Sequence, residues 1–283
     1  MPVRKPPTAR QRRLGAELRR MREHVGMTIN EAATLHRTDR TTVSNTESAR
    51  SGVSGDRVRV WASNYCCPDP RYVDALEAMA RERGSNWWGE FRDAVPSYML
   101  DLVELEHHAV ALRHVQITHL PGLLQHEDYA RAVFGEAVPP LTSAAMDLQV
   151  DFRMRRRGLL DRTDPPDCSF LLHEAALRML LGDRTVVRRQ LEDLLEHSER
   201  DSVTLRVIPF TAGGFPSAGS STMYASGPVG QLDTVQIDVP NGVTFLDSET
   251  HLTNYRAVLD RMETRSLEPK RSRDFIRKVL HEL

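Results

Sequence analysis

Residues 26–47 read Gly-Met-Thr-Ile-Asn-Glu-Ala-Ala-Thr-Leu-His-Arg-Thr-Asp-Arg-Thr-Thr-Val-Ser-Asn-Thr-Glu, and this stretch predicts two short helices joined by a tight turn. Gly26 suits the left-handed residue that closes a preceding helix. Thr28 with Glu31 three residues later forms a capping box, and Asp39 is a second N-cap, so the second helix is expected to begin near Arg40. Many small proteins use such a helix pair to place one helix in the major groove of DNA.

The second helix has a polar face suited to reading DNA bases, because residues three and four apart are neighbours on a helix. That face combines the arginine, threonine, serine and asparagine side chains of the segment. Arginine pairs well with guanine, and asparagine pairs well with adenine. The predicted DNA-binding residues, on this helix and at the ends of the pair, are Arg40, Thr41, Ser44, Asn45, Thr28, Arg37 and Arg50.

Apolar stripes on both sides of this segment predict a compact bundle of about five helices over residues 10–83. A small helical hairpin with a solvated polar face is the alternative, and the stripes weigh against it. A disordered basic arm is expected at residues 1–9. The stripes are Leu14, Leu18, Met21 and Val25, then Val58, Trp61 and Tyr65, then Val73, Leu76 and Ala80.

Charge is distributed unevenly along the 283 residues. Residues 1–60 contain 13 Lys+Arg and 6 Asp+Glu, although the whole chain contains 38 and 39 and has a net charge of −1. A basic head on an acidic body fits a nucleic-acid-binding module joined to a domain with another task. We therefore expect that the larger part of the chain does not wrap DNA.

The remaining sequence predicts a linker at 84–96, with the Trp87-Trp88 pair buried, and an α+β domain over 97–283. Pro240-Asn241-Gly242 is a strong hairpin signal, and Ser272 is expected to cap the last helix. The predicted fold is mainly α in two domains: a five-helix helix-turn-helix bundle, then a small, mostly antiparallel sheet flanked by helices. The main expected elements of the second domain are helices at 97–112, 127–134 and 143–160, and strands at 115–120, 168–173, 203–210, 221–225, 234–239 and 243–246.

No motif in the chain predicts catalysis, a metal or a cofactor. Cys66 and Cys67 are adjacent and lack the spacing of a zinc site, and the glycine-rich segment 212–221 lacks the end of a phosphate-binding loop. No Gly-x-Ser-x-Gly nucleophile elbow is present. No run approaches the ~20 apolar residues that a membrane span needs. We expect a cytoplasmic protein that is not an enzyme and that joins the nucleoid when bound to DNA.

An arginine run on the expected helix at 143–160 is open to two interpretations. It is either a solvated face or a site for an anion or an acidic partner, because guanidinium groups bind carboxylates and phosphates well. A small-molecule pocket between the sheet and this helix is a further option. The candidate partner or ligand residues are Arg153, Arg156 and Arg157.

The order of several short segments resembles known regulators over nearly the whole chain. The bundle resembles the Xre type of helix-turn-helix found in phage repressors. The larger domain resembles that of actinobacterial antitoxin-like regulators of the WhiJ type. The segments that carry the second resemblance are Leu120-Pro121-Gly122-Leu123-Leu124-Gln125, Tyr129-Ala130-Arg131-Ala132, Arg153 and Arg156, His173-Glu174-Ala175-Ala176-Leu177-Arg178, Arg189-Gln190-Leu191 and Val207-Ile208-Pro209-Phe210.

The resemblance implies a transcription factor that reads an inverted-repeat operator on double-stranded DNA as a homodimer. It also implies control of the larger domain by a small acidic protein, often encoded nearby, and a buried ion pair between Arg22 and Glu47. The alternative is a protein-interaction module that mainly sequesters the acidic partner, with DNA binding secondary. Residues 120–129 are either a partner surface or core, and the leucines among them are expected in the core.

Overall fold

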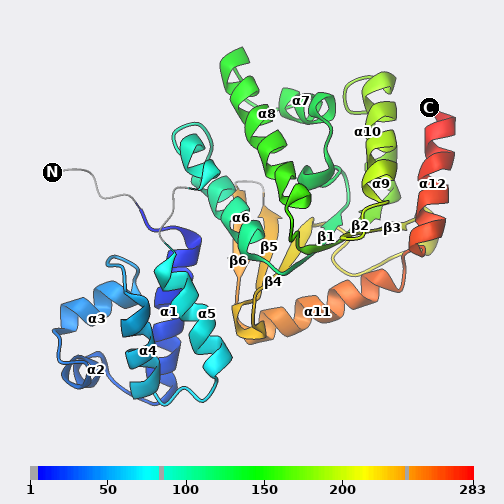
Figure 1. The fold of residues 1–283 in the computed structure, drawn as a ribbon. Coiled ribbons are helices and arrows are strands. Elements are labelled where there is room, and N and C mark those ends of the chain that lie inside the picture. The colour runs from blue at the N-terminus through cyan, green and yellow to red at the C-terminus, as the bar shows by residue number, and fades with distance from the viewer. Residues whose placement is uncertain (1–5, 83–85, 240–241) are drawn as a thin grey trace. The chain divides into compact units, whose positions relative to one another are not determined.

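In this computed structural model the described residues are 6–82, 86–239 and 242–283, and the chain divides into two units, Met1–Asn86 and Trp87–Leu283 (Figure 1). Part of the arm expected at 1–9 and two of the three residues of the hairpin signal at 240–242 lie outside the described residues. The last two residues of that arm belong to the first helix, because Thr8 is its N-cap and Ala9 its first residue.

The first unit is a bundle in which every helix begins at a Thr, Ser or Asp N-cap. In each case the cap side chain accepts a hydrogen bond from the backbone amide three residues later, which satisfies a donor that the helix leaves unpaired. The first helix packs against the third, fourth and fifth, and Leu18, Val43, Val58, Trp61 and Leu76 are buried. The helices are α1 (Ala9–His24), α2 (Ile29–Leu35), α3 (Arg40–Glu47), α4 (Gly55–Asn64) and α5 (Pro70–Arg81).

The second unit is built on a six-stranded mixed sheet in the order β3-β2-β1-β4-β5-β6. The β1–β2 and β2–β3 pairs are parallel, and the β1–β4, β4–β5 and β5–β6 pairs are antiparallel. This mainly helical fold with a sheet flanked by helices confirms the predicted fold class. The strands are β1 (Ala111–Gln116), β2 (Asp167–His173), β3 (Val203–Ile208), β4 (Thr222–Ser226), β5 (Thr234–Val239) and β6 (Gly242–Leu246).

Helices cover both faces of this sheet, with α11 on one face and α6, α7, α8 and α10 on the other (Figure 1). The parallel strands are joined by helical crossovers, as parallel pairing requires. The α-helices are α6 (Ser97–His108), α7 (Glu127–Gly135), α8 (Ser143–Arg157), α9 (Glu174–Arg178), α10 (Arg184–His197), α11 (Glu249–Glu263) and α12 (Pro269–Glu282). The 3-10 helices are η1 (Trp87–Phe91), η2 (Gly122–Leu124), η3 (Gly158–Asp161), η4 (Phe210–Ala212) and η5 (Gly230–Leu232).

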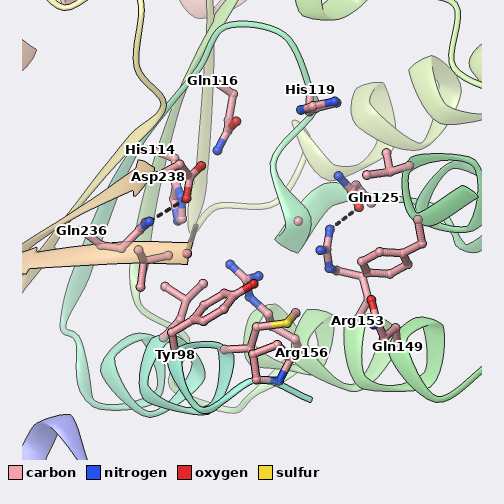
Figure 2. A pocket seen from close by; sticks show the side chains of 18 of the residues that line it. Tyr98, His114, Gln116, His119, Gln125, Gln149, Arg153, Arg156, Gln236 and Asp238 are labelled. Atoms are coloured by element: carbon pink, nitrogen blue, oxygen red, sulfur yellow. Dashed lines mark hydrogen bonds between the residues drawn. The ribbon is translucent and has the colours of Figure 1, made fainter. Parts of the chain in front are cut away.

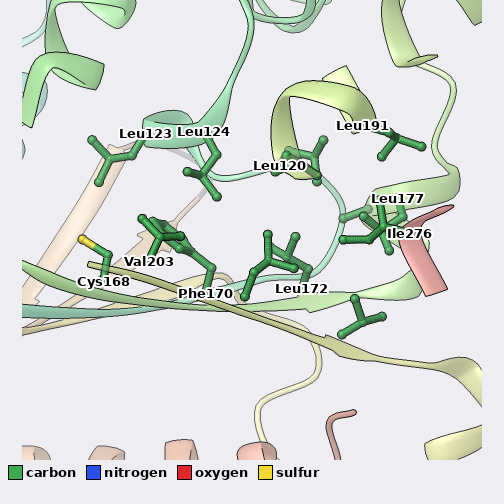
Figure 3. Close-up of a cluster of buried hydrophobic side chains, with 14 of the residues drawn as sticks. Leu120, Leu123, Leu124, Cys168, Phe170, Leu172, Leu177, Leu191, Val203 and Ile276 are labelled. Carbon is green, nitrogen blue, oxygen red and sulfur yellow. The ribbon is translucent and has the colours of Figure 1, made fainter. Parts of the chain in front are cut away.

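The main core lies between the sheet and the many-helix face (Figure 3). Leu120, Leu123 and Leu124 are at most 2% exposed and pack in the same cluster as Phe170 of β2 and Leu191 of α10. These three leucines are therefore core and not a partner surface. Alternation along β2 places Leu171 on the opposite face, where it packs with α11.

Several boundaries and one cap differ from the sequence-based expectation. The helix expected at 143–160 ends at Arg157, and the strand expected at 203–210 ends at Ile208. The helix expected at 97–112 ends at His108, and the strand expected at 115–120 lies at Ala111–Gln116, because the backbone turns extended at Ala109. Ser272 does not cap α12: it lies inside the helix, fully buried, where its hydroxyl accepts from the Val207 amide and donates to the Leu267 carbonyl. That hydrogen-bonding position explains why a serine occurs there.

Part of the expected linker belongs to the second unit. Trp88 and Phe91 of η1 are buried with Phe152 of α8, and Trp87 packs against the same cluster. The aromatic pair therefore adds to the core of its own unit. No helix among the described residues is long and apolar enough to cross a membrane.

Candidate nucleic-acid interface

The helix pair α2–α3 is fixed by hydrogen bonds at both helix starts. Glu31 accepts from the Thr28 amide at 2.7 Å while Thr28 Oγ1 accepts from the Glu31 amide at 3.3 Å, which confirms the predicted capping box. Asp39 accepts from the amide and the hydroxyl of Thr42 at 2.8 and 2.7 Å. Arg37 in the connecting turn adopts φ 52°, in the left-handed region of the backbone. This conformation is less favourable for a residue with a Cβ atom than for glycine. Arg37 is exposed and precedes the start of α3 by three residues.

One face of α3 is buried and the other is open. Val43 and Thr46 are at most 2% exposed and seat the helix on the bundle. Arg40 and Thr41 are exposed, and Ser44 and Asn45 behind them are half-buried. The remaining predicted DNA-binding residues, which are all exposed, are Thr28, Arg37 and Arg50. The open face thus presents a cation, two hydroxyls and an amide, which together can donate and accept hydrogen bonds at base edges.

A buried ion pair holds the end of α3 on α1. Arg22 donates from Nε and Nη2 to the two carboxylate oxygens of Glu47 at 2.6 and 2.8 Å, and its Nη1 donates to the Met27 carbonyl at 2.7 Å. The hydrogen bond with Glu47 raises the pKa of Arg22 above its ordinary value. Gly15 of α1 lies so close that an added Cβ would be 2.5 Å from the Glu47 carbonyl oxygen. The Arg22–Glu47 ion pair and the close approach of Gly15 therefore fix the position and the orientation of α3 on α1.

A histidine that sequence reasoning missed joins α2 to α4. His36 stacks on Trp61 at 4.4 Å between ring centroids, its Nε2 lies 2.8 Å from the Tyr65 hydroxyl, and its Nδ1 lies 3.1 Å from Asn64 Nδ2. Burial, with the charge of Arg57, lowers the pKa of His36 to about 4. The folded first unit therefore holds this ring neutral at neutral pH.

The stability of the first unit is expected to fall as the pH drops from about 6.5 to about 4. In that window the unfolded chain binds a proton at His36 and the folded chain does not, so acid favours unfolding. Amide hydrogen exchange in α2 and α4, compared at pH 7 and pH 5 after correction for intrinsic rates, measures the loss. His36→Gln should flatten this dependence, whereas His24→Gln, at an exposed position of α1, should not. An unchanged dependence in His36→Gln would contradict the assignment.

The three candidate partner arginines of the second unit lie in different surroundings. Arg156 is bound to Glu106 of α6 by two buried hydrogen bonds of 2.7 and 2.6 Å. Arg157 donates to the Gln125 carbonyl at 3.0 Å and forms an ion pair with Asp193 of α10. Arg153 donates to the Gln125 side chain and lines a cavity. The three guanidinium groups therefore do not form one exposed basic patch.

Two family models match the chain. A helix-turn-helix domain matches residues 13–76, which cover most of α1, all of α2 to α4 and the first part of α5. A domain of unknown function, DUF5753, matches residues 99–278, which cover most of the second unit. No curated protein and no solved structure matches the chain. Taken with the open face of α3, the first match shows a DNA-binding regulator.

Proposed function

The chain belongs to the DUF5753 family, and from its added helix-turn-helix domain we propose a sequence-specific transcriptional regulator that is controlled through the family domain. The regulator reads an inverted-repeat operator as a homodimer, each α3 entering the major groove of one half-site. It is an Xre-like, antitoxin-like protein of the cytoplasm and it acts without catalysis. The controlling signal is a small protein partner or a ligand that binds the second unit.

The observation that carries this proposal is the two-sided character of α3. Its apolar side is locked to the bundle by Val43 and by the Arg22–Glu47 pair, so the helix cannot turn its polar side inward. The polar side is open and carries Arg40 at its N-terminal end. In helix-turn-helix proteins the N-terminal residues of the recognition helix contact base edges. A merely solvated helix needs neither the rigid seat nor this combination of side chains.

Arg40→Ala is expected to weaken operator binding by about 1–3 kcal/mol and to relax preference at one base pair in each half-site. The guanidinium is exposed, so its loss should leave the fold intact. Binding of the full chain to its selected operator and to operator variants, measured by fluorescence anisotropy, tests this. Arg19→Ala is the control, because Arg19 is an exposed arginine of α1 paired with Glu23. Unchanged affinity and preference in Arg40→Ala would show that the register proposed for the recognition helix is wrong.

A basic exposed face on α12 favours a second candidate function, that of a module which mainly sequesters a small acidic protein. The helix buries Ile276 and Val279 against the sheet side. Its opposite side carries four exposed cations, Lys270, Arg271, Arg277 and Lys278. Two of them form ion pairs within the helix, Arg277 with Asp274 and Lys278 with Glu282, so the face has a smaller positive excess at Lys270 and Arg271. Such a charged face attracts an acidic partner through complementary charge.

Paired substitutions separate the two functions in cells. Arg40→Ala combined with Asn45→Ala removes base contacts, and a regulator then loses control of its target genes. A sequestering module keeps its cellular effect in that variant and loses it when Lys270 and Arg271 are replaced by glutamate. We expect Arg40→Ala combined with Asn45→Ala to abolish control of the target genes.

A further inference from the structure

A cavity of about 450 Å³ lies in the second unit between the sheet and helices α6 and α8 (Figure 2). Its volume falls within the range of small-molecule sites in proteins. In Figure 2, His114, Gln236 and Asp238 come from the sheet side, while Gln125, Gln149 and Arg153 face them across the open space. Tyr98 of α6 and Arg156 of α8 also line the space. Polar groups thus converge on one space from elements far apart in the chain.

The sheet wall of the cavity is polar where a covered sheet face is normally apolar. His114 of β1 and Gln236 of β5 lie in one row across the sheet, since both pair with Met223 of β4. They are 4% and 5% exposed. Burying polar side chains has a cost unless hydrogen bonds compensate it. The Nε2 atom of His114 is buried without a hydrogen-bond partner among the described residues, which is the kind of atom that a bound molecule can satisfy.

The helix wall holds more positive than negative charge. An added Cβ at Gly122 would lie 3.0 Å from Arg156 Nη1 and 3.1 Å from Arg153 Nη1, so both guanidinium groups approach the same glycine. Glu106 neutralises Arg156 through two hydrogen bonds. Among the described residues no carboxylate lies within ion-pair distance of Arg153, and its one hydrogen-bond partner is the neutral Gln125 side chain. Arg153 is therefore a cation without a directly bonded carboxylate, although the charges of Glu106 and Asp238 act on it through space.

The charge of Arg153 persists in this setting. Burial, followed by the neighbouring charge of Arg156, lowers the pKa of Arg153 to about 9, which still leaves a cation at neutral pH. The guanidinium also lies over the Phe134 ring, 4.8 Å from its centroid. An anion placed here would replace lost hydration with a charge-assisted hydrogen bond, the strongest kind that proteins use.

Apolar side chains form the rest of the cavity lining and restrict the chemical character of the ligand. Met99 and Leu102 of α6 and Val133 and Phe134 of α7 line it, so the ligand has an apolar body. On the opposite wall Asp238 is an acceptor that receives one hydrogen bond, from Gln236 Nε2 at 2.7 Å. A hydroxyl or amine at the far end of the ligand would find its acceptor there.

We propose that this cavity binds a small organic acid, with its carboxylate on Arg153, its apolar body against α6 and α7, and a hydrogen-bond donor toward Asp238. Binding depends only on the second unit. That the bound acid serves as the regulatory signal rests on the proposed function. The assignment also explains why Arg156 and Arg153 lie side by side although only one of them has a carboxylate partner.

Thermal unfolding of the full chain tests the site with three probes at millimolar concentration: 4-hydroxyphenylacetate, 3-(4-hydroxyphenyl)propionate and 8-hydroxyoctanoate, each beside its neutral amide. We expect at least one acid to raise the unfolding midpoint, because a ligand that binds only the folded state stabilises it, while the matching amide does not. Calorimetric titration of that acid then gives its affinity. Arg153→Gln should weaken it by about tenfold or more.

Two further variants keep the test decisive. Arg155→Gln, at an exposed arginine of the same helix, should bind as the wild type does. Gln149→Trp, at a half-buried position lining the cavity, should abolish binding by filling the space without changing any charge. The proposal is overturned if no acid shifts the midpoint, or if either Arg153→Gln or Gln149→Trp binds the acid as the wild type does.

Operator binding is measured separately, without acid, so the two proposals fail in different ways. If the chain binds its operator but none of the acids, only the proposed cavity site is overturned. Acid binding by a chain that shows no operator preference would overturn only the transcriptional role.

Discussion

Glu47→Leu is expected to destabilise the first unit by about 3–5 kcal/mol, because it leaves the Arg22 guanidinium buried without its counter-charge. The side chains of Arg22 and Glu47 are only 6% and 5% exposed, so water cannot take over the role of the carboxylate. The double variant Arg22→Met with Glu47→Leu should recover most of the loss, since well-packed apolar residues often replace a buried ion pair without cost. Operator affinity should fall in Glu47→Leu, because α3 is no longer held in place on α1.

Hydrogen exchange of the full chain measures this effect in α1 and α3 and uses the second unit as an internal reference. Glu23→Gln is the matched control. Its carboxylate also lies near Arg22, at 3.6 Å, but its side chain is half-exposed, and such surface pairs contribute about 0–1 kcal/mol. Wild-type protection of α3 in Glu47→Leu would show that the pair does not hold the recognition helix.

Glu106→Leu is expected to destabilise the second unit by about 3–5 kcal/mol for the same physical reason. Glu106 and Arg156 have side chains 1% and 9% exposed, and they join α6 to α8 beside the cavity. Two guanidinium groups would then approach Gly122 without any carboxylate between them. Salt should change this loss little, because buried charges are screened much less than exposed ones.

Urea unfolding followed by exchange in α6 and α8 measures this second loss. Glu90→Leu is the control. Glu90 pairs with Arg155, the neighbour of Arg156 on α8, but the Glu90 side chain is 65% exposed. Combining Glu106→Leu with Arg156→Met should restore stability. A single variant as stable as the control would contradict the structural role of the pair.

Local signals in the sequence were sufficient for the helix pair. The cap residues Thr28 and Asp39 and the polar and apolar spacing of α3 act within one or two turns, so the sequence alone predicts them. The Arg22–Glu47 contact spans 25 residues, and only the family resemblance predicts it. The contact between His36 and Tyr65 spans 29 residues, and no local pattern marks it.

The cavity could be anticipated only as a space between the sheet and α8. Its charge balance depends on Glu106 pairing with Arg156 and not with Arg153, and sequence spacing does not distinguish these arginines. Its polar row depends on strand register across β1, β4 and β5, which follows from the sheet order. Ser272 was misassigned because serine is common at N-caps, whereas here its hydroxyl bonds a strand inside the core.

Selection of bound fragments from the source genome with the purified full chain, at two salt concentrations, tests the central claim most directly. We expect the wild type to enrich a short inverted repeat at both concentrations and Arg40→Ala with Asn45→Ala to lose the enrichment. Phosphate contacts alone give binding that weakens steeply with salt and carries no sequence preference. If the wild type showed only such binding, indistinguishable from that of the double variant, α3 would not be a recognition helix.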